Sequence, residues 1–491
     1  MPATTENKPT PVIDALFIDG QWRPAESKST FPVTNPATGE LLAEVSDASV
    51  DDVRDAIAAA NAALPAWSKR TAYQRAEVLF EAHRRMLERS EQLAKLMTEE
   101  QGKPIRAAGI EVKYAADFLI WFAEEAKRVY GQTIPSARAD QRFMVLHQPV
   151  GVVGAITPWN YPVSMITRKV APALAAGCTV VLKAAEQTPL CAIEVFRILE
   201  ESGVPPGVVN LVTTSDPAPV GAEFVSNPAV AKLTFTGSTS VGKLLARGAG
   251  GNMKRFSMEL GGHAPFVVFD DADPAHAAKG AAMVKVLNTG QACISPNRLY
   301  VHRCIKDAFL TVLVERVAKM KAGSGLTEGV SIGPLIDADA LQRMQRQVDD
   351  AVSKGAVVET GGRRLAENGL ERGFFFAPTV LSGVTDAMDI YREETFGPIA
   401  PVIVFDDEDE VIAMANDTDY GLASYVYTQN LARAWRVIEQ LRFGMVGVND
   451  INPTSAAAPF GGVKQSGQGR EGAHEGILEY LDTKLIGFSI G

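Results

Sequence analysis

From residue 150 onward, short apolar and β-branched runs alternate with stretches of helical periodicity, and this alternation constrains the fold most. The apolar runs are Gly151–Thr157, Thr179–Lys183, Val208–Thr213 and Lys232–Thr236. Helical stretches follow them at 162–176, 188–201, 218–225 and 240–249. Strand and helix alternating at this spacing predict right-handed βαβ crossovers on a parallel sheet, which is the doubly wound arrangement of nucleotide-binding domains.

A second series of the same kind begins near residue 260. Its expected strands are PFVVFDD, NRLYVH, APTVL, APVIVF and GMVGVN, with helices over 274–288 and 306–322. Amphipathic helices are expected earlier in the chain, over 50–66, 76–101 and 108–128. The strand-like segments Gln141–Gln148 and Ile477–Ile490 lie outside both series, and we expect them to pair with another subunit, since unpaired strand edges invite aggregation.

The charge balance disfavours several kinds of partner. The 491 residues include 48 Lys and Arg against 58 Asp and Glu, a formal charge of −10, so nucleic acid and anionic membranes are poor partners. Apolar stretches are interrupted well before the roughly 20 residues of a membrane span, and the first residues do not have the pattern of a secretory signal. Four scattered cysteines and six histidines without metal-ligand spacing lead us to expect a metal-free, cytoplasmic protein.

Two glycine-rich segments could bind a phosphate. Gly467–Gly472 matches G-x-G-x-x-G, but PFGGVKQS precedes it where a dinucleotide fingerprint needs a strand, so a glycine-rich turn is favoured. The segment Phe235–Gly242 (FTGSTSVG) follows an expected strand and opens a helix. There Gly237 and Ser238 would leave the N–H groups of the helix open to an anion. Taken alone, an ordinary strand–turn–helix explains that segment equally well.

Two segments carry reactive side chains beside small residues. In Ser257–Gly262 (SMELGG), Glu259 stands before two glycines, where a surface glutamate at a turn is the simpler reading. In Asn288–Cys293 (NTGQAC), the thiol of Cys293 follows a turn that leaves room for a substrate. A single cysteine is most often a buried apolar residue, which we expect of Cys178, Cys191 and Cys304.

Seven motifs occur together and in one order: TPWN (157–160), KAAE (183–186), FTGSTSVG, MELGG, GQAC, EETFGP (393–398) and PFGG (459–462). With them, the chain from about Asn35 to its C-terminus resembles the NAD(P)-dependent aldehyde dehydrogenase superfamily. Stretches such as EQGKP, WFAEEAKRVYG and SIGPLID resemble its succinate-semialdehyde dehydrogenase branch.

The resemblance implies an α/β fold: a Rossmann-type cofactor domain, an α/β catalytic domain and a small β oligomerisation arm. Residues 1–130 and 150–260 would form the NAD-binding domain, and 261–461 the catalytic domain. Residues 131–149 and 477–491 would be oligomerisation strands of a homotetramer or homodimer.

The resemblance also implies a mechanism. Cys293 would add to the aldehyde carbon, and the thiohemiacetal would pass hydride to nicotinamide and leave a thioester for hydrolysis. Asn160 and the Cys293 N–H would form the oxyanion hole, and Glu259 would be the general base.

The expected cofactor contacts, also implied by the resemblance, are Ile156, Trp159, Lys183, Glu186, Gly237, Ser238, Glu394 and Phe396. Glu186 can accept hydrogen bonds from ribose hydroxyls but would repel a 2′-phosphate, so NAD is expected to be preferred, with NADP possible.

The expected substrate site departs from that branch. Arg168 and Thr454 match its carboxylate contacts, but Leu287 stands where the branch has an arginine, and Ser295 stands where some members have a second cysteine. An anionic aldehyde is therefore expected: succinate semialdehyde first, with glutarate semialdehyde, 2-oxoglutarate semialdehyde or sulfolactaldehyde as alternatives. Two other classes stay open, a non-catalytic binding protein and a cofactor-free cysteine esterase.

Overall fold

The computed structural model describes residues 11–491, so the segment on which the absence of a secretory signal was expected lies mostly outside the described residues. Its first large sheet has eight strands in the order β20-β12-β11-β8-β9-β10-β2-β3. The strands are β2 (Leu16–Ile18), β3 (Gln21–Arg23), β8 (Val152–Ile156), β9 (Thr179–Lys183), β10 (Val209–Val212), β11 (Val230–Thr236), β12 (Arg255–Glu259) and β20 (Gly467–Gln468). β8 to β12 pair in parallel, so the predicted doubly wound sheet is confirmed.

Helix ends in this half follow local chemistry. The helices are α1 (Val50–Ser68), α2 (Ala72–Glu88), α3 (Ser90–Gln101), α4 (Ile105–Glu125), α5 (Ser164–Ala176), α6 (Pro189–Glu201), α7 (Pro217–Ser226) and α8 (Thr239–Gly251). Proline opens α6 and α7, where its missing N–H costs nothing, and Gly177 ends α5 at φ 96°. The single helix predicted over 76–101 is wrong, because Arg89 leaves helical geometry (φ −97°, ψ 12°) and forms an ion pair with Glu201.

The second large sheet has the order β15-β16-β17-β14-β13-β18-β19. Its strands are β13 (Ala264–Val268), β14 (Pro296–His302), β15 (Val357–Thr360), β16 (Thr379–Ser382), β17 (Ile399–Phe405), β18 (Ala423–Tyr427) and β19 (Met445–Val448). Its helices are α9 (Pro274–Lys285), α10 (Lys306–Ala318), α11 (Ala338–Ser353), α12 (Asp389–Arg392), α13 (Glu408–Asn416) and α14 (Leu431–Gln440). The sequence did not predict β15, β18, α11, α12, α13 or α14.

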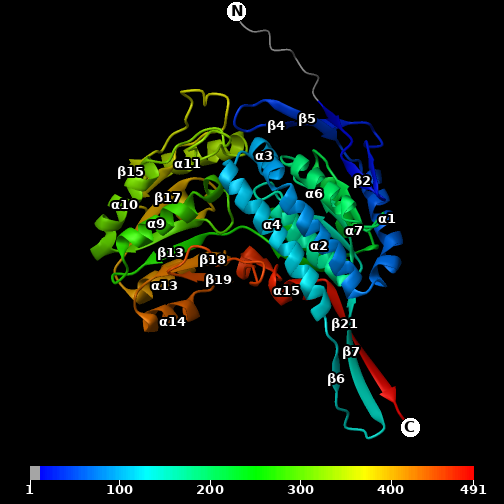
Figure 1. Cartoon of the computed structure of the whole chain (residues 1–491). Helices are drawn as coiled ribbons and strands as arrows, with labels where there is room; N and C mark the ends of the chain where they lie inside the picture. The colour runs from blue at the N-terminus through cyan, green and yellow to red at the C-terminus, as the bar shows by residue number, and fades with distance from the viewer. Residues whose placement is uncertain (1–10) are drawn as a thin grey trace, which may run out of the picture.

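A three-stranded arm projects from the body (Figure 1). It consists of β6 (Gln132–Ile134), β7 (Gln141–Pro149) and β21 (Leu481–Ser489), and β21 pairs antiparallel with β7 along nine residue pairs. The two outlying segments therefore pair with each other within one chain. The start of the second segment was predicted wrongly, because Ile477 belongs to the short helix α15 (Ala473–Leu478).

The C-terminal segment crosses back from the second sheet to the first. β20 pairs antiparallel with the end of β12, with Glu259 opposite Gly467. A Cβ on Gly467 would lie 2.1 Å from the Met258 carbonyl oxygen, so this glycine serves close strand packing. The G-x-G-x-x-G match is thus an edge strand followed by a turn.

A small N-terminal sheet of β1 (Val12–Ile13), β5 (Leu41–Ser46) and β4 (Thr30–Thr34) completes the described chain. Within residues 11–491, no helix is both long and apolar enough to cross a membrane, and no group of three or more His, Cys, Asp and Glu side chains could hold a metal ion.

Candidate active site

Two cavities meet at the thiol of Cys293. The first is lined by residues that include Trp159, Asn160, Gly237, Ser238, Glu259, Glu394 and Phe396. The second is lined by residues that include Lys103, Glu111, Tyr114, Arg168, Leu287, Thr454 and Phe460. Among the described residues, only Cys293 and Met165 line both. A molecule in either cavity can therefore reach the same sulfur atom.

The loop before Cys293 is held in an uncommon backbone conformation. Asn288 and Thr289 have φ values of 50° and 60°, a left-handed region that costs about 1–3 kcal/mol for residues other than glycine. Surrounding contacts impose it: the Gly333 N–H donates to Thr289 Oγ1 (3.1 Å), and the Ile336 N–H donates to Gln291 Oε1 (2.9 Å). The helix predicted over 274–288 consequently ends early, at Lys285.

Glu259 ends β12 in a buried position. Neither carboxylate oxygen has a hydrogen-bond partner among the described residues, and burial raises the pKa of Glu259 to about 8 although Arg168 opposes the shift. Burial, then the charge of Glu259, raises the pKa of the Cys293 thiol well above its usual value. Burial thus favours the neutral, protonated form of both groups over a thiolate or a carboxylate.

Asn160 follows β8, is 4% exposed and lines the first cavity. Its Nδ2 donates to the Gln291 carbonyl oxygen (3.0 Å), which leaves its second N–H for another acceptor. The Asn160 carbonyl oxygen accepts from Lys103 Nζ and from Asn288 Nδ2, both at 2.8 Å. Main chain and side chain of Asn160 are therefore both fixed.

The first cavity has the features of a dinucleotide cleft. Ser238 is the N-cap of α8, so the N-terminal amides of that helix face this cavity. A Cβ on Gly237 would lie 2.5 Å from the Phe235 ring, so a side chain has no room there. Phe396 packs edge-on against Trp159, with ring centroids 5.5 Å apart. These residues fit a dinucleotide: a phosphate at the amides and a flat ring near the aromatics.

Glu394 supplies a carboxylate to the same cleft, and its Oε1 accepts the Gly262 N–H at 2.8 Å. The other expected cofactor residues lie at strand ends beyond the lining residues. Ile156 ends β8, and Lys183 ends β9 with its Nζ 2.7 Å from Glu186 Oε2. The structure thus gathers five of the eight expected cofactor residues around one cavity.

The second cavity contains one buried cation from α5. Arg168 is 2% exposed, stacks 3.9 Å from the centroid of the Phe460 ring, and has Nη2 2.8 Å from Glu471 Oε2. Its Nε and Nη2 have no hydrogen-bond partner among residues 11–491, so the contact with Glu471 is ionic only. Leu287, 39% exposed, adds an apolar wall, and Thr454 Oγ1 donates to Asn452 Oδ1 (2.7 Å).

Comparison with known proteins identifies this arrangement. The family model described as "Aldehyde dehydrogenase family" matches residues 22–486. The chain belongs to the aldehyde dehydrogenase family. It is therefore an oxidoreductase that uses NAD(P), which confirms the family and the enzyme class expected from the sequence.

Individual relatives agree with the family assignment. A probable succinate-semialdehyde dehydrogenase [NADP(+)] of Sinorhizobium fredii is 52% identical over 94% of this chain and 93% of its own. A glutarate-semialdehyde dehydrogenase of Pseudomonas putida is 49% identical over 96% and 97% of the two chains. The crystal structure of succinate-semialdehyde dehydrogenase from Burkholderia pseudomallei superposes with a TM-score of 0.95, at 46% identity over 99% and 100% of the chains.

Sequence reasoning missed several buried charged residues around this site. Lys103 and Glu111 form an ion pair on the wall of the second cavity, and Lys169 Nζ lies 2.5 Å from Glu471 Oε1. Burial lowers the pKa of Lys285 to about 7, although the nearby Glu394 opposes the shift. The only local signal for these residues is the motif EQGKP, which contains Lys103. The motif indicates the family resemblance but not the contact that Lys103 makes.

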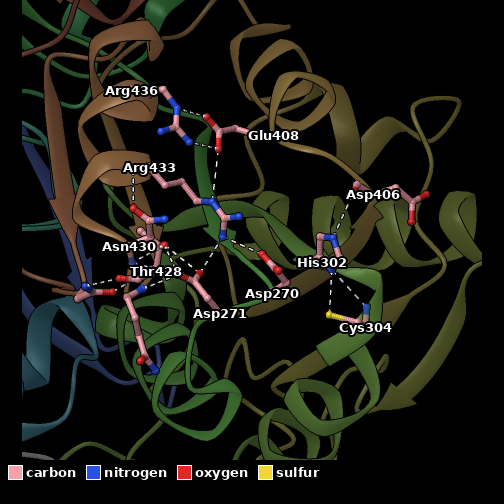
Figure 2. Close-up of polar contacts among 12 residues, drawn as sticks. Asp270, Asp271, His302, Cys304, Asp406, Glu408, Thr428, Asn430, Arg433 and Arg436 are labelled. Carbon is pink, nitrogen blue, oxygen red and sulfur yellow. Dashed lines mark hydrogen bonds and ion pairs between the residues drawn. The ribbon is translucent and has the colours of Figure 1, made fainter.

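Cys304 differs from the expectation that it is buried, because it lies exposed in the short 3₁₀ turn Arg303–Ile305 between β14 and α10. Figure 2 shows its sulfur beside His302, whose Nδ1 lies 3.1 Å away and whose Nε2 contacts the Asp406 carbonyl oxygen (3.0 Å). Neither residue lines the two cavities, and the neighbouring Arg433–Glu408 ion pair belongs to a surface network. The spatial Cys–His pair thus lies away from the site at Cys293.

We expect Cys293→Ala to abolish aldehyde-dependent NADH formation while NAD still binds, because no other thiol faces both cavities. Cys304→Ala is the matched control and should retain wild-type activity, since its pairing with His302 lies elsewhere. Absorbance at the NADH band after aldehyde addition measures both variants. Turnover by Cys293→Ala above a trace would contradict the assignment.

We expect kcat/KM to rise with pH between about 6 and 8 and then level off. A carboxyl group with a pKa of about 8 is protonated below that pH, so the base form of Glu259 grows about tenfold for each pH unit until pH 8. Steady-state rates across this range test the point. The Glu259→Gln variant should lose the rising limb, and a limb that persists in it would assign the titration to another group.

Proposed function

We propose that this enzyme oxidises an anionic aldehyde to the carboxylate, with succinate semialdehyde as the preferred substrate. The observation that carries the proposal is the buried Arg168, which lines the cavity beside Cys293 and, beyond its ion pair with Glu471, keeps its Nε without a hydrogen-bond partner among residues 11–491. A buried guanidinium with an N–H group left over from its ion pair is suited to a carboxylate. The succinate-semialdehyde dehydrogenase relatives support the same substrate.

The local charge balance favours an anion. Arg168 and Lys169 together carry two positive charges, and Glu471 supplies one negative charge between them. The cluster therefore keeps a net positive charge in a cavity whose other walls include Leu287 and Phe460. A carboxylate entering there completes the neutralisation of the cluster.

Glutarate semialdehyde is the second candidate, and Leu287 is the observation that favours it. An apolar side chain at this wall adds no second cation, but it can contact one more methylene group, worth about 0.8 kcal/mol when buried. A Pseudomonas relative carries this activity in its name. 2-Oxoglutarate semialdehyde and sulfolactaldehyde are further candidates, and their kcat/KM values should be measured beside those of the first two aldehydes.

The proposed chemistry uses three groups of the chain. Glu259 accepts the Cys293 proton, the sulfur adds to the aldehyde carbon, and the oxyanion is bound by the free N–H of Asn160 and the Cys293 N–H. A bound nicotinamide supplies the hydride acceptor. Glu259 then releases the thiol proton to solvent, and as a carboxylate again it deprotonates the water that hydrolyses the thioester on Cys293. The unpartnered carboxylate oxygens of Glu259 support both of its roles.

We also propose that NAD is preferred over NADP. Trp159, Gly237, Ser238, Glu394 and Phe396 would hold the phosphates and the nicotinamide half, and Ile156, Lys183 and Glu186 the adenosine half. Glu186 already neutralises Lys183, so a 2′-phosphate would meet a carboxylate instead of a free ammonium group. The Sinorhizobium relative is named for NADP, so measuring the cofactor preference of this enzyme tests the proposal directly.

The arm supports a homotetramer or homodimer as the assembled state. β21 carries exposed apolar side chains, Leu485 and Phe488, on a strand with one unpaired edge, and pairing with another subunit would cover them. The free thiols suit the reducing cytoplasm. The mass of the intact chain in solution tests the assembly.

We expect wild-type kcat/KM to be higher with NAD than with NADP, and Glu186→Ser to shift the ratio toward NADP by about tenfold. Removing the carboxylate relieves its repulsion of the 2′-phosphate and frees Lys183 to pair with it, a change of about 1.4 kcal/mol. Initial rates with both cofactors give the ratio. A wild-type advantage for NADP would refute the preference.

We expect Arg168→Ala to lower kcat/KM for succinate semialdehyde about ten- to a hundredfold while butanal changes little. A hydrogen bond to a charged group contributes about 1.5–3 kcal/mol. Butanal has no carboxylate and makes no such bond with Arg168, so the substitution removes nothing from its binding. Glu471 keeps Lys169 as its partner in this variant, so no buried carboxylate is left uncompensated.

Leu287→Arg is the complementary variant, and it should improve succinate semialdehyde more than glutarate semialdehyde. Kinetics on the three aldehydes decide between the candidates. An equal loss on succinate semialdehyde and butanal in Arg168→Ala would make Arg168 structural and overturn the anionic substrate.

A further inference from the structure

Lys103 is a buried cation on the wall of the second cavity, and its contacts converge on Asn160 and its neighbours. It follows the C-cap glycine of α3 and is 1% exposed. Its ammonium group has three partners: the Glu111 carboxylate, the Asn160 carbonyl oxygen at 2.8 Å and the face of the Tyr161 ring at 4.1 Å. Every donor of this side chain is therefore directed at Glu111 or at residues 160–161.

The Lys103 segment is closely packed against residues 325–333. A Cβ on Gly333 would lie 2.1 Å from the Gly102 carbonyl oxygen, and one on Gly325 would lie 2.6 Å from the Lys103 carbonyl oxygen. Residues 325–333 thus lie directly against residues 102–103. Gly333 of the same segment also exchanges hydrogen bonds with Thr289 Oγ1, in the loop 288–292 that precedes Cys293.

Glu111 extends the same contact to α5. Its second oxygen, Oε1, accepts the N–H groups of Val163 (3.0 Å) and Ser164 (3.1 Å) at the start of that helix. The Lys103–Glu111 pair therefore binds both the peptide of Asn160 and the N-terminus of the helix that carries Arg168.

We infer that Lys103 is a positioning residue for the reaction at Cys293: its ammonium group fixes the peptide of Asn160, so that the Asn160 carboxamide faces the sulfur. The inference rests on the proposed role of Asn160 in binding the oxyanion. Asn288 holds the same carbonyl oxygen from the cysteine loop, so the two donors set the Asn160 peptide relative to Cys293.

The expected effect is large for a residue that contacts neither reacting atom. A displacement of about 1 Å in a catalytic group can cost a hundredfold in rate. Lys103→Met keeps the length of the side chain but removes the bond to Asn160, and we expect it to slow the chemical step about ten- to a hundredfold.

A double-mutant cycle tests the inference through the acylation of Cys293 by p-nitrophenyl acetate, which forms the same kind of oxyanion without cofactor or aldehyde. The four enzymes are wild type, Lys103→Met, Asn160→Ala and the double variant. If Lys103 acts through Asn160, Lys103→Met slows acylation ten- to a hundredfold in the wild type and less than twofold in the Asn160→Ala background. An equal factor in both backgrounds, or an Asn160→Ala variant that acylates like the wild type, overturns the inference.

Lys232→Met is the matched control. Lys232 is also fully buried, pairs with Glu479 at 3.5 Å and lies 5.1 Å from the Tyr480 ring, but it contacts no residue of either cavity wall named above. Its acylation rate should stay within twofold of the wild type, and an equal loss would show that any buried lysine has this effect, which overturns the inference.

Should Lys103→Met alone fail to fold, the pair Lys103→Met/Glu111→Gln enters the cycle in its place, because it leaves no uncompensated buried charge. Aldehyde oxidation by the wild type tests the proposed function separately. If the wild type oxidises no anionic aldehyde but the acylation rates follow the cycle above, the proposed substrate is wrong and the inference about Lys103 stands.

Discussion

The carboxylate of Glu471 binds two buried cations of α5, and the substrate side of the molecule depends on that contact. Without it, Arg168 and Lys169 would be two like charges in a nearly dry interior, which costs several kcal/mol for each ion. Burial alone would raise the pKa of Glu471, but Lys169 and Arg168 hold it below its usual value. A β-bridge between Phe460 and Glu471 places the aromatic face and the ionic partner of Arg168 together.

Burial also sets the acid–base character of the reaction centre. Glu259 and Glu394 are both carboxyl groups whose pKa values burial raises, to about 8 and about 7. Each therefore changes protonation near neutral pH, where an exposed carboxylate would stay ionised. The site needs no unusual residue types, because removal from water gives ordinary carboxylates this property.

Local sequence patterns predicted the first sheet well and the side-chain contacts of the site poorly. β9 has the predicted bounds, because an apolar β-branched run ending in a turn signal leaves little choice. Motifs named Cys293, Glu259 and Asn160, and the structure brings all three to one cavity. The Lys103–Asn160 and Arg168–Glu471 contacts join residues far apart in the chain, and no periodicity or propensity encodes such pairs. The prediction that Cys304 is buried was wrong, because the residue type alone does not tell whether a side chain lies at the surface.

The nine residue pairs between β21 and β7 have a consequence for the order of assembly. β7 is complete at residue 149, but its partner β21 begins only at residue 481, and β20 and Glu471 come shortly before it. The strands of the second large sheet, from β13 to β19, are contiguous in sequence between these two parts. During synthesis the second large sheet can therefore form first. The edge of β7 stays unpaired, and Arg168 and Lys169 stay without their carboxylate partner, until residues 471–489 have been made.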